Sequence, residues 1–335
     1  MKIPAQHDGF DDLRLEFREM LKSQIVKGNN GLKKAKYISF TVEADNLEQA
    51  SAMLERLEID ILSGFKNMGV RAESLNGEER LKILHDMLNP DKNFSFSYKD
   101  LKKKESTKSY IVPDMFNFTP NRYFKFGKFI GATSHFQILA SELSDRMLSE
   151  FLDIDDNISI SFHIQAIDQS EAIKMVKRKN TDLDKMRIEE NKKAVRSGYD
   201  MDILPSDLVT YGEDVKSLLK DLQTRDERMF VVSIVFFNFA RTVQKLENTI
   251  AKISSIANKH NCKIKRLDHA QEQGLVSVLP IGLNQMEINR SLTSSSTAVF
   301  IPFTTEELFI NSEKSLYYGL NALSHNLIMA DRKKL

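Results

Sequence analysis

The stretch MFVVSIVFFNF, residues 229–239, is the most apolar strand-like segment of the chain. β-Branched and aromatic side chains dominate it, which is typical of a strand in the middle of a sheet. It is too short for a membrane-spanning helix, which needs roughly 20 apolar residues. We therefore expect a central strand here, and the rest of the fold is inferred outward from it.

The elements that follow this strand form a regular order. Residues 241–260 carry Val243, Leu246, Ile250 and Ile253 on one helical face, residues 262–267 predict a strand, and residues 271–279 predict a short helix. The same order of strand, helix, strand and helix is predicted at 36–44, 46–67, 70–75 and 77–88. The pattern predicts an α+β fold of two α/β sub-units with mostly antiparallel sheets, for which a ferredoxin-like arrangement is one candidate.

The segment between these units has two parts. Residues 93–136 are rich in Phe and Tyr and are punctuated by Pro and Gly, which predicts short strands in a meander, followed by a helix at 141–152. After a strand at 157–166, helices at 169–197 and 205–224 predict a long helical hairpin inserted between strands. We expect an N-terminal subdomain at 1–152, a second at 153–289 and a separate C-terminal segment at 290–335.

The C-terminal segment begins with RSLTSSSTAVFIPF, residues 290–303, which we interpret as a Ser/Thr-rich turn before a β-branched and aromatic run. Thr304 and Glu307 are spaced as a helix capping box, with Thr304 as the N-cap. Residues 317–321 and 326–333 predict two short strands around a turn.

Four stretches carry a resemblance to a known family. They are residues 165–230, residues 262–282 (CKIKRLDHAQEQGLVSVLPIG), residues 291–309 (SLTSSSTAVFIPFTTEELF) and residues 317–335 (YYGLNALSHNLIMADRKKL). They resemble the segment that precedes the motor domain in TraE/TraC-type ATPases of type IV secretion systems, in the branch found on Gram-positive conjugative elements. The resemblance covers nearly the whole chain.

The resemblance implies a non-catalytic N-terminal portion of a conjugative-transfer ATPase that docks to inner-membrane platform proteins and self-associates in its full-length form. Family members extend beyond this chain at both ends, and their Walker A loop follows the segment that matches 317–335. ATP and magnesium would belong to that motor, so no cofactor is expected here, and this chain is not expected to be an enzyme. The implied location is the cytoplasm, at the inner face of the membrane.

If residues 290–335 couple this portion to a motor, the polar and aromatic residues at their turns and strand ends are the candidate coupling residues. These are Thr293, Ser294, Ser295, Thr304, Glu307, Tyr317, Tyr318, Asn321 and Arg332.

Composition limits the alternatives. The chain has 335 residues, 41% of them hydrophobic and 28% charged, which is enough for a core and about two domains. A net charge of +1 predicts no global attraction to nucleic acid, so any such contact must be a local patch. Cys262 is the one cysteine, which excludes an internal disulfide. The first residues lack the apolar region of a signal peptide, and we expect a soluble, cytoplasmic chain.

Motifs for phosphate, metal or nucleophilic chemistry are weak or absent. Residues 64–69 (GFKNMG) resemble the start of a P-loop, but Val70 and Arg71 stand where Lys and Ser/Thr are required. We interpret Gly69 as the residue that ends a helix. Asp153, Asp155 and Asn157 resemble the start of a calcium loop, but Ile158 replaces its glycine, so a turn before a strand is favoured. The seven histidines are scattered and predict no metal site.

The alternative function is a stand-alone nucleic-acid-binding α+β module. Lys102, Lys103 and Lys104 lie within the aromatic-rich segment and are the candidate contacts, since exposed aromatics beside cations bind single strands. Core aromatics with a solvated loop remain the favoured interpretation. A second basic cluster, Lys174 to Lys179, lies on the long helix, where acidic residues follow, and there we favour a solvated, salt-bridged face over a DNA-binding track.

Overall fold

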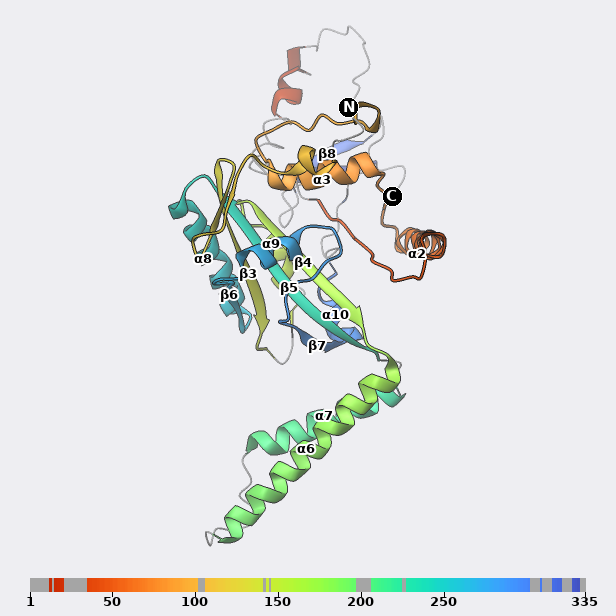
Figure 1. The fold of residues 1–335 in the computed structure, drawn as a ribbon, viewed down its shortest axis with the longest axis vertical. Coiled ribbons are helices and arrows are strands. Elements are labelled where there is room, and N and C mark those ends of the chain that lie inside the picture. Colours follow the sequence, from red (N-terminus) through yellow and green to blue (C-terminus); the bar gives the residue numbers. More distant parts are fainter. Residues whose placement is uncertain are drawn as a thin grey trace.

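The computed structural model describes residues 12–13, 15–20, 35–101, 106–140, 143–144, 146–196, 206–224, 227–301, 308, 315–320 and 327–331. Within these residues the fold is α+β with antiparallel strands, which confirms the predicted class. A seven-stranded sheet lies at the centre, helices lie against it, and a pair of long helices projects away from one end (Figure 1).

Strand β5, Met229–Ala240, is the central strand, as the sequence predicts. Along one edge it pairs with β4, Ile158–Ala166. Along the other edge it pairs with β3, Phe129–Ile138, and with β7, Arg290–Thr293. These two strands lie end to end, since β3 pairs with residues 235–240 of β5 and β7 pairs with residues 229–232. Backbone hydrogen bonds therefore occupy both edges of the most apolar segment.

Two interleaved β-α-β units form the framework of the sheet. The first consists of β3, helix α5 (Arg146–Leu152) and β4, and the second of β5, helix α8 (Val243–Lys259) and β6 (Cys262–Arg266). Because β6 pairs with the far edge of β3, the strand order is β6-β3-β5-β4. This is the split, ferredoxin-like arrangement. It occurs once and combines residues from both expected subdomains, so the sheet crosses the boundary expected at 152/153.

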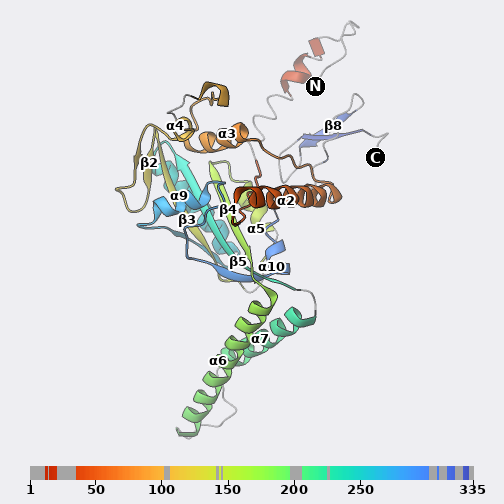
Figure 2. The ribbon, with the colours of Figure 1, turned by 45° about the vertical axis from the view of Figure 1, so that its right-hand side comes forward.

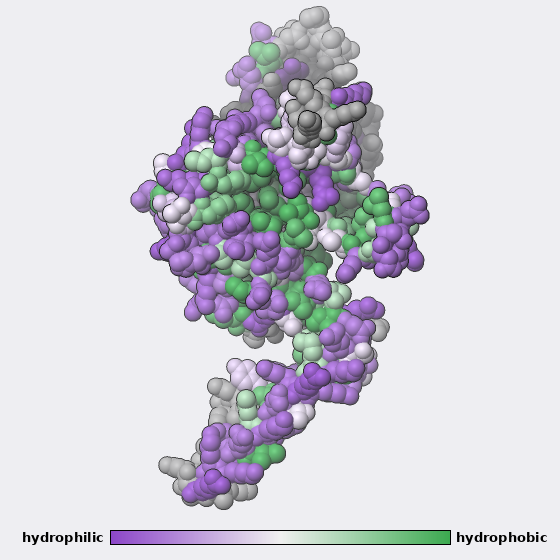
Figure 3. All heavy atoms as spheres, in the orientation of Figure 1, coloured by the Kyte–Doolittle hydropathy of each residue, from purple (hydrophilic) through white to green (hydrophobic). Residues whose placement is uncertain are grey.

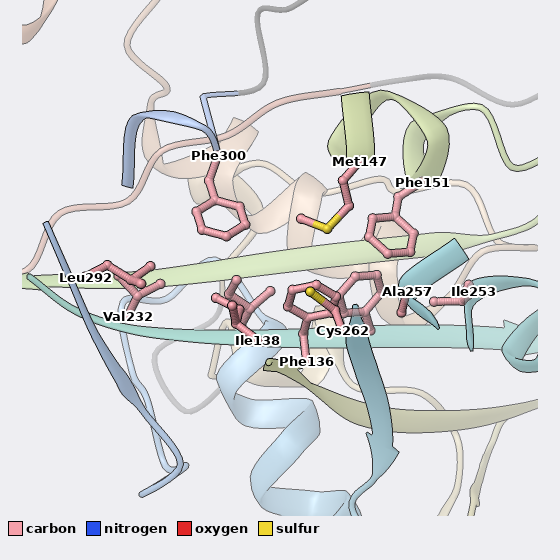
Figure 4. Close-up of a cluster of buried hydrophobic side chains, with 12 residues drawn as sticks. Phe136, Ile138, Met147, Phe151, Val232, Ile253, Ala257, Cys262, Leu292 and Phe300 are labelled. Carbon is pink, nitrogen blue, oxygen red and sulfur yellow. The ribbon is translucent and has the colours of Figure 1, made fainter. Parts of the chain in front are cut away.

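The two faces of the sheet carry separate cores, because side chains alternate along each strand. Val232, Ile234 and Phe236 of β5 lie on the face covered by α5 and α8. Figure 4 shows this core, in which buried side chains of strands and helices meet, among them Phe136, Ile138, Met147, Phe151, Ile253, Ala257 and Cys262. Cys262 is thus a core residue, and burial raises the pKa of its thiol.

The opposite face is largely aromatic. Val235 and Phe237 of β5 pack there against Phe124, Phe126 and Phe129. These phenylalanines belong to the predicted meander, which consists of β1 (Phe116–Asn117), β2 (Phe124–Phe126) and β3. Helix α9, Gln271–Val278, and the end of helix α3, Gly77–Leu88, complete this core. The earlier aromatics, Phe94, Phe96 and Tyr98, are not in strands and cluster with Tyr110 instead.

The first predicted α/β unit is only half correct. Helix α2, Leu47–Asn67, and helix α3 begin and end close to the predicted positions. The strands expected at 36–44 and 70–75 are wrong, because the structure places both segments outside either sheet. Residues 36–44 are anchored by side chains instead: Ser39 Oγ donates to Pro280 O at 2.9 Å and Thr41 Oγ1 donates to Gly282 O at 3.3 Å.

The predicted helical hairpin is present between β4 and β5. It consists of α6, Gln169–Arg196, and α7, Ser206–Thr224. Both views of the ribbon show it projecting from the end of the sheet (Figures 1 and 2). Its apolar packing is concentrated near the sheet, where Ala172 and Val176 of α6 meet Leu222 of α7 and Met229 of β5.

The C-terminal residues form two separate pieces. β7 is followed directly by a short helix, α10 (Ser294–Ala298), so the Ser/Thr run is a strand end and a helix rather than only a turn. The predicted pair of short strands is confirmed as β8, Leu316–Leu320, and β9, Leu327–Ala330, which pair antiparallel in a second sheet.

Gly274 of α9 allows that helix to approach β3 closely. A Cβ on Gly274 would lie 2.7 Å from both Thr133 Cβ and Leu267 Cδ1. We expect Gly274→Ala to lower the free energy of unfolding by about 1–3 kcal/mol, as overpacked cores do. Gly64→Ala is the control, because nothing lies within 4 Å of a Cβ there and alanine favours the helix. Urea unfolding measures both, and an unchanged midpoint for Gly274→Ala would contradict the close packing.

Asp156 fastens α8 to the turn before β4. Its carboxylate is only 7% exposed and accepts from Lys252 Nζ at 2.9 Å, with Lys245 Nζ at 3.6 Å. Burial on its own would raise the pKa of Asp156, but the hydrogen bond and charge of Lys252, helped by Thr249 and Lys245, bring it below its usual value. The residues 153–157 thus form a turn tied to a helix, as the sequence favours.

The pKa of Asp156 is lower in the folded protein than in the unfolded chain. The ion pair therefore contributes its full stabilisation at pH values above the ordinary carboxyl pKa, and this contribution is lost as the pH falls through the pKa of the folded state. We expect Asp156→Asn to lower stability by about 1–3 kcal/mol at pH 7, and by progressively less as the pH falls below the ordinary carboxyl pKa of about 4. Thermal melts across this pH range measure the difference. A constant difference at all pH values would exclude the ionised carboxylate as its source.

Candidate interface sites

Three of the candidate coupling residues, Thr293, Ser294 and Ser295, lie together where the helical hairpin joins the sheet. Thr293 ends β7 and caps α10, its Oγ1 accepting from Ser296 N at 3.3 Å. Ser294 N donates to Arg228 O at 2.9 Å, and Arg228 N donates back to Ser294 Oγ at 2.9 Å. The start of α10 is therefore bound to the residues that lead from α7 into β5.

Glu227 extends this contact through its carboxylate. Ser295 donates to it twice, from its hydroxyl and from its backbone N at 3.3 Å. The hydroxyl of Ser295 is the main cause that holds the pKa of Glu227 below its usual value, against the opposing effect of burial. An ionised Glu227 therefore strengthens the contact between α10 and the end of the hairpin.

Gln169 joins the other helix of the hairpin to the same place. Its Nε2 donates to Leu222 O at 2.7 Å and to Glu227 O at 3.1 Å. We call Gln169, Glu227, Arg228, Ser294 and Ser295 the hairpin root. Through it, the first turn of α6, the strand β5 and the C-terminal helix α10 form one hydrogen-bonded group.

Tyr317 and Tyr318 lie elsewhere, in β8. Tyr317 is paired in register with Met329, and its ring lies 6.3 Å from that of Phe17 in an edge-on arrangement. A register shift between Tyr317 and Gly319 interrupts the pairing with β9. Figure 1 shows β8 beyond one end of the large sheet and β7 and α10 near its other end, where the hairpin begins. The structure therefore does not bring these tyrosines together with Ser294 and Ser295.

The remaining candidates fall outside the residues that the structure describes. These are the coupling residues Thr304, Glu307, Asn321 and Arg332 and the candidate nucleic-acid contacts Lys102, Lys103 and Lys104.

The aromatic segment does not form an exposed stacking platform across the sheet. Phe124 and Phe126 are fully buried, and Phe129 is 8% exposed. Their rings pack on Phe237 and Phe239 of β5, with centroid distances of 5.5–5.9 Å. Because a base can stack only on an exposed ring face, these three side chains serve the core.

The P-loop-like residues 64–69 end a helix, as the sequence favours. Gly69 has a positive φ of 71°. Val70 N donates to Phe65 O at 2.9 Å and Gly69 N donates to Lys66 O at 3.1 Å, which is the hydrogen-bond pair of a Schellman motif. The carbonyl end of α2 therefore lies here, and it disfavours an anion.

One small cavity in the described region opens between the end of α3 and the β2–β3 turn. Its volume is about 180 Å³, and Lys92 pairs with Asp114 beside it at 2.6 Å. Ligand pockets for drug-sized molecules usually exceed ~300 Å³, so this cavity is small for a nucleotide. Among the described residues, no group of three or more His, Cys, Asp and Glu could hold a metal ion.

Two further elements present unusual exposed surface. α2 has no buried residue, and Leu47 and Ile59 are 86% and 68% exposed. Hydrophobic side chains of this helix are visible at the right of Figure 3. The outer part of α6 is exposed and mostly hydrophilic in the same view. Helices without a packed face of this kind are candidates for contact with other molecules.

Comparisons with known proteins add no relative. No family model matches the chain, and no curated protein matches it. In the described part of the chain, no helix is both long enough and apolar enough to cross a membrane.

The sequence indicated Thr293, Ser294 and Ser295 but missed Gln169, Glu227 and Arg228. Gln169 was visible only as the start of a helix, and Glu227 and Arg228 only as polar residues before a strand. Ser295 and Glu227 are 68 positions apart, and no local pattern reports a contact between such distant residues.

Ser295→Ala removes the hydroxyl that Glu227 accepts from and is expected to loosen the hairpin root. A hydrogen bond to a charged group contributes about 1.5–3 kcal/mol, and less at a partly solvated site. We expect amide hydrogen exchange in residues 167–172 and 227–230 to accelerate at least threefold, because these residues open locally. Ser217→Ala on the exposed side of α7 is the control, and equal exchange in the two variants would contradict the root as a unit.

Proposed function

We propose that the chain is the non-catalytic N-terminal portion of a type IV secretion ATPase of the conjugative-transfer family. In this proposal it docks the ATPase to platform proteins at the inner face of the membrane. It also transmits the movement of a C-terminal P-loop motor to them. The resemblance of residues 165–230, 262–282, 291–309 and 317–335 supports the family assignment.

The hairpin root is the observation that carries the coupling role. Residues 290–298 lie in the segment that, by resemblance, leads toward the motor. Ser294 and Ser295 in this segment hydrogen-bond to Arg228 and Glu227, and Glu227 in turn accepts from Gln169 of α6. A displacement of α10 therefore acts directly on the root of a helix of 28 residues, or about 42 Å. A small movement at the root becomes a larger one at the tip of the hairpin.

We assign docking to two exposed elements, the helical hairpin and helix α2. The hairpin projects from the body, and α2 exposes Leu47, Met53, Leu54 and Ile59. A helix that is amphipathic but has no buried residue gains stability when a partner covers its apolar stripe. The alternative, a nucleic-acid module using the aromatic segment, is disfavoured for Phe124, Phe126 and Phe129, which are buried.

The coding DNA downstream of codon 335 tests the family assignment. We expect an in-frame G-x-x-x-x-G-K-[ST] motif within a few tens of residues, because backbone amides, Lys and a hydroxyl are the parts that hold nucleotide phosphates and magnesium. A stop codon with no motor gene nearby would contradict the proposal.

With the continuous gene, a Gln169→Ala/Ser295→Ala variant tests the coupling role. Conjugative DNA transfer should fall about tenfold or more while the protein level and the ATP hydrolysis rate of the motor persist, since only transmission is lost. Ser217→Ala should transfer DNA normally. Unchanged transfer by the double variant would exclude the root as the coupling element.

A further inference from the structure

The outer face of α6 carries a basic stripe along most of its length. Lys174, Arg178, Lys185, Lys192 and Arg196 recur at intervals of four and seven residues, and these intervals return to one face of a helix. All five side chains are exposed. At a rise of 1.5 Å per residue the stripe extends over about 33 Å. We call these five residues the α6 stripe.

The stripe faces away from the partner helix. Ala172 and Val176, the buried residues of α6, each lie two positions from a stripe residue and therefore about 200° around the helix. They pack toward α7. Three acidic residues of α6, Glu171, Asp182 and Glu189, lie three or four positions from stripe cations and form a row along one side of the stripe. Asp184 and Glu190 lie farther around the helix.

Salt bridges on the stripe are few, although the charge of Lys174 also acts on the carboxylate of Asp168. Lys185 has a carboxylate partner, Asp182, at 3.5 Å, and both side chains are more than 60% exposed, so the pair is weak. In the described part of the chain, no salt bridge joins Lys174, Arg178, Lys192 or Arg196 to an acidic side chain. The salt bridges that the sequence favoured are therefore present at Lys193 and Glu190, beside the stripe, and at Lys185 and Asp182, on it.

We infer that the α6 stripe binds the phosphate backbone of a nucleic acid duplex, independently of base sequence. A duplex presents about one negative charge per 1.7 Å of axis, and 33 Å corresponds to about one helical turn. The stripe holds no aromatic residue, so it lacks the stacking groups of a single-strand site. This inference goes beyond the proposed function and stands without a motor domain.

A membrane surface fits the stripe less well. Helices that lie on membranes bury a continuous apolar face, whereas Met175 and Ile188, two exposed large apolar residues beside the stripe cations, are 13 positions apart. Figure 3 shows the hairpin as mostly hydrophilic on the face in view. The hairpin also projects clear of the sheet, so a rod-shaped duplex can approach α6 without meeting the body of the protein (Figures 1 and 2).

Fluorescence anisotropy of the 335-residue chain with labelled 24-base-pair duplexes tests the inference. Two unrelated DNA sequences should bind equally, and a matching RNA duplex shows whether the site distinguishes the two backbones. Log affinity should fall with log salt with a slope of about −3 to −5, since each neutralised phosphate contributes about −0.9. The variant Lys174→Gln/Arg178→Gln/Lys192→Gln should bind at least tenfold more weakly, with a slope reduced by about 2–3.

The matched control is Lys179→Gln/Arg187→Gln/Lys216→Gln, which removes two Lys and one Arg from exposed positions off the stripe. It should bind within about twofold of the unmodified chain. Arg178→Gln/Arg196→Gln is a second, smaller stripe variant, and circular dichroism melts confirm that all variants are folded.

Three outcomes would overturn the inference. One is the absence of duplex binding at 50 mM salt. Another is an equal loss in the stripe variant and in its control, which would indicate net charge alone. The third is stripe-dependent binding to vesicles of phosphatidylglycerol and phosphatidylcholine without any duplex binding, which would assign the stripe to a membrane surface.

Discussion

The structure depends on one constraint: strand β5 is buried on both faces and paired along both edges. The segment holds too many apolar side chains for one face to remain in water, so two cores form, one around Phe236 and one around Phe237. Strand β5 has twelve residues, and two shorter stretches, in β3 and β7, pair with successive parts of its second edge. The guanidinium of Arg290 donates to Ile138 O, where these two strands meet.

Local patterns in the sequence were enough to predict most of the helices and the strands of the large sheet. Helical spacing of apolar residues located α2, α3, α8 and the hairpin, because this signal acts within a few residues. The same reasoning failed at 36–44, where the apolar pattern suits a strand but the segment joins neither of the sheets that the structure describes. Alternation reports how a segment could be buried, whereas a strand also needs a neighbour, and only the tertiary fold supplies one.

The functional surfaces were less accessible to sequence reasoning, for a related reason. Ser294 and Ser295 were chosen for their place in the chain, and their partners, Glu227 and Arg228, become visible only once β5 and β7 pair. The sequence favours a solvated, salt-bridged face for α6, because the sequence alone does not show which side of the helix packs. Burial of Ala172 and Val176 defines that side and shows that the five stripe residues lie on the face turned away from it.

The place where the hairpin is inserted has a consequence for how the molecule can change. Ala166 and Phe230 are cross-strand partners, so the chain leaves the sheet and re-enters it at adjacent backbone positions. The closure entropy of such an insertion grows only slowly with its length, by about 0.6 kcal/mol for each doubling. Whole helical turns can therefore be gained or lost at the tip without disturbing a strand register. The reach of the hairpin and the architecture of the sheet are thus free to evolve separately.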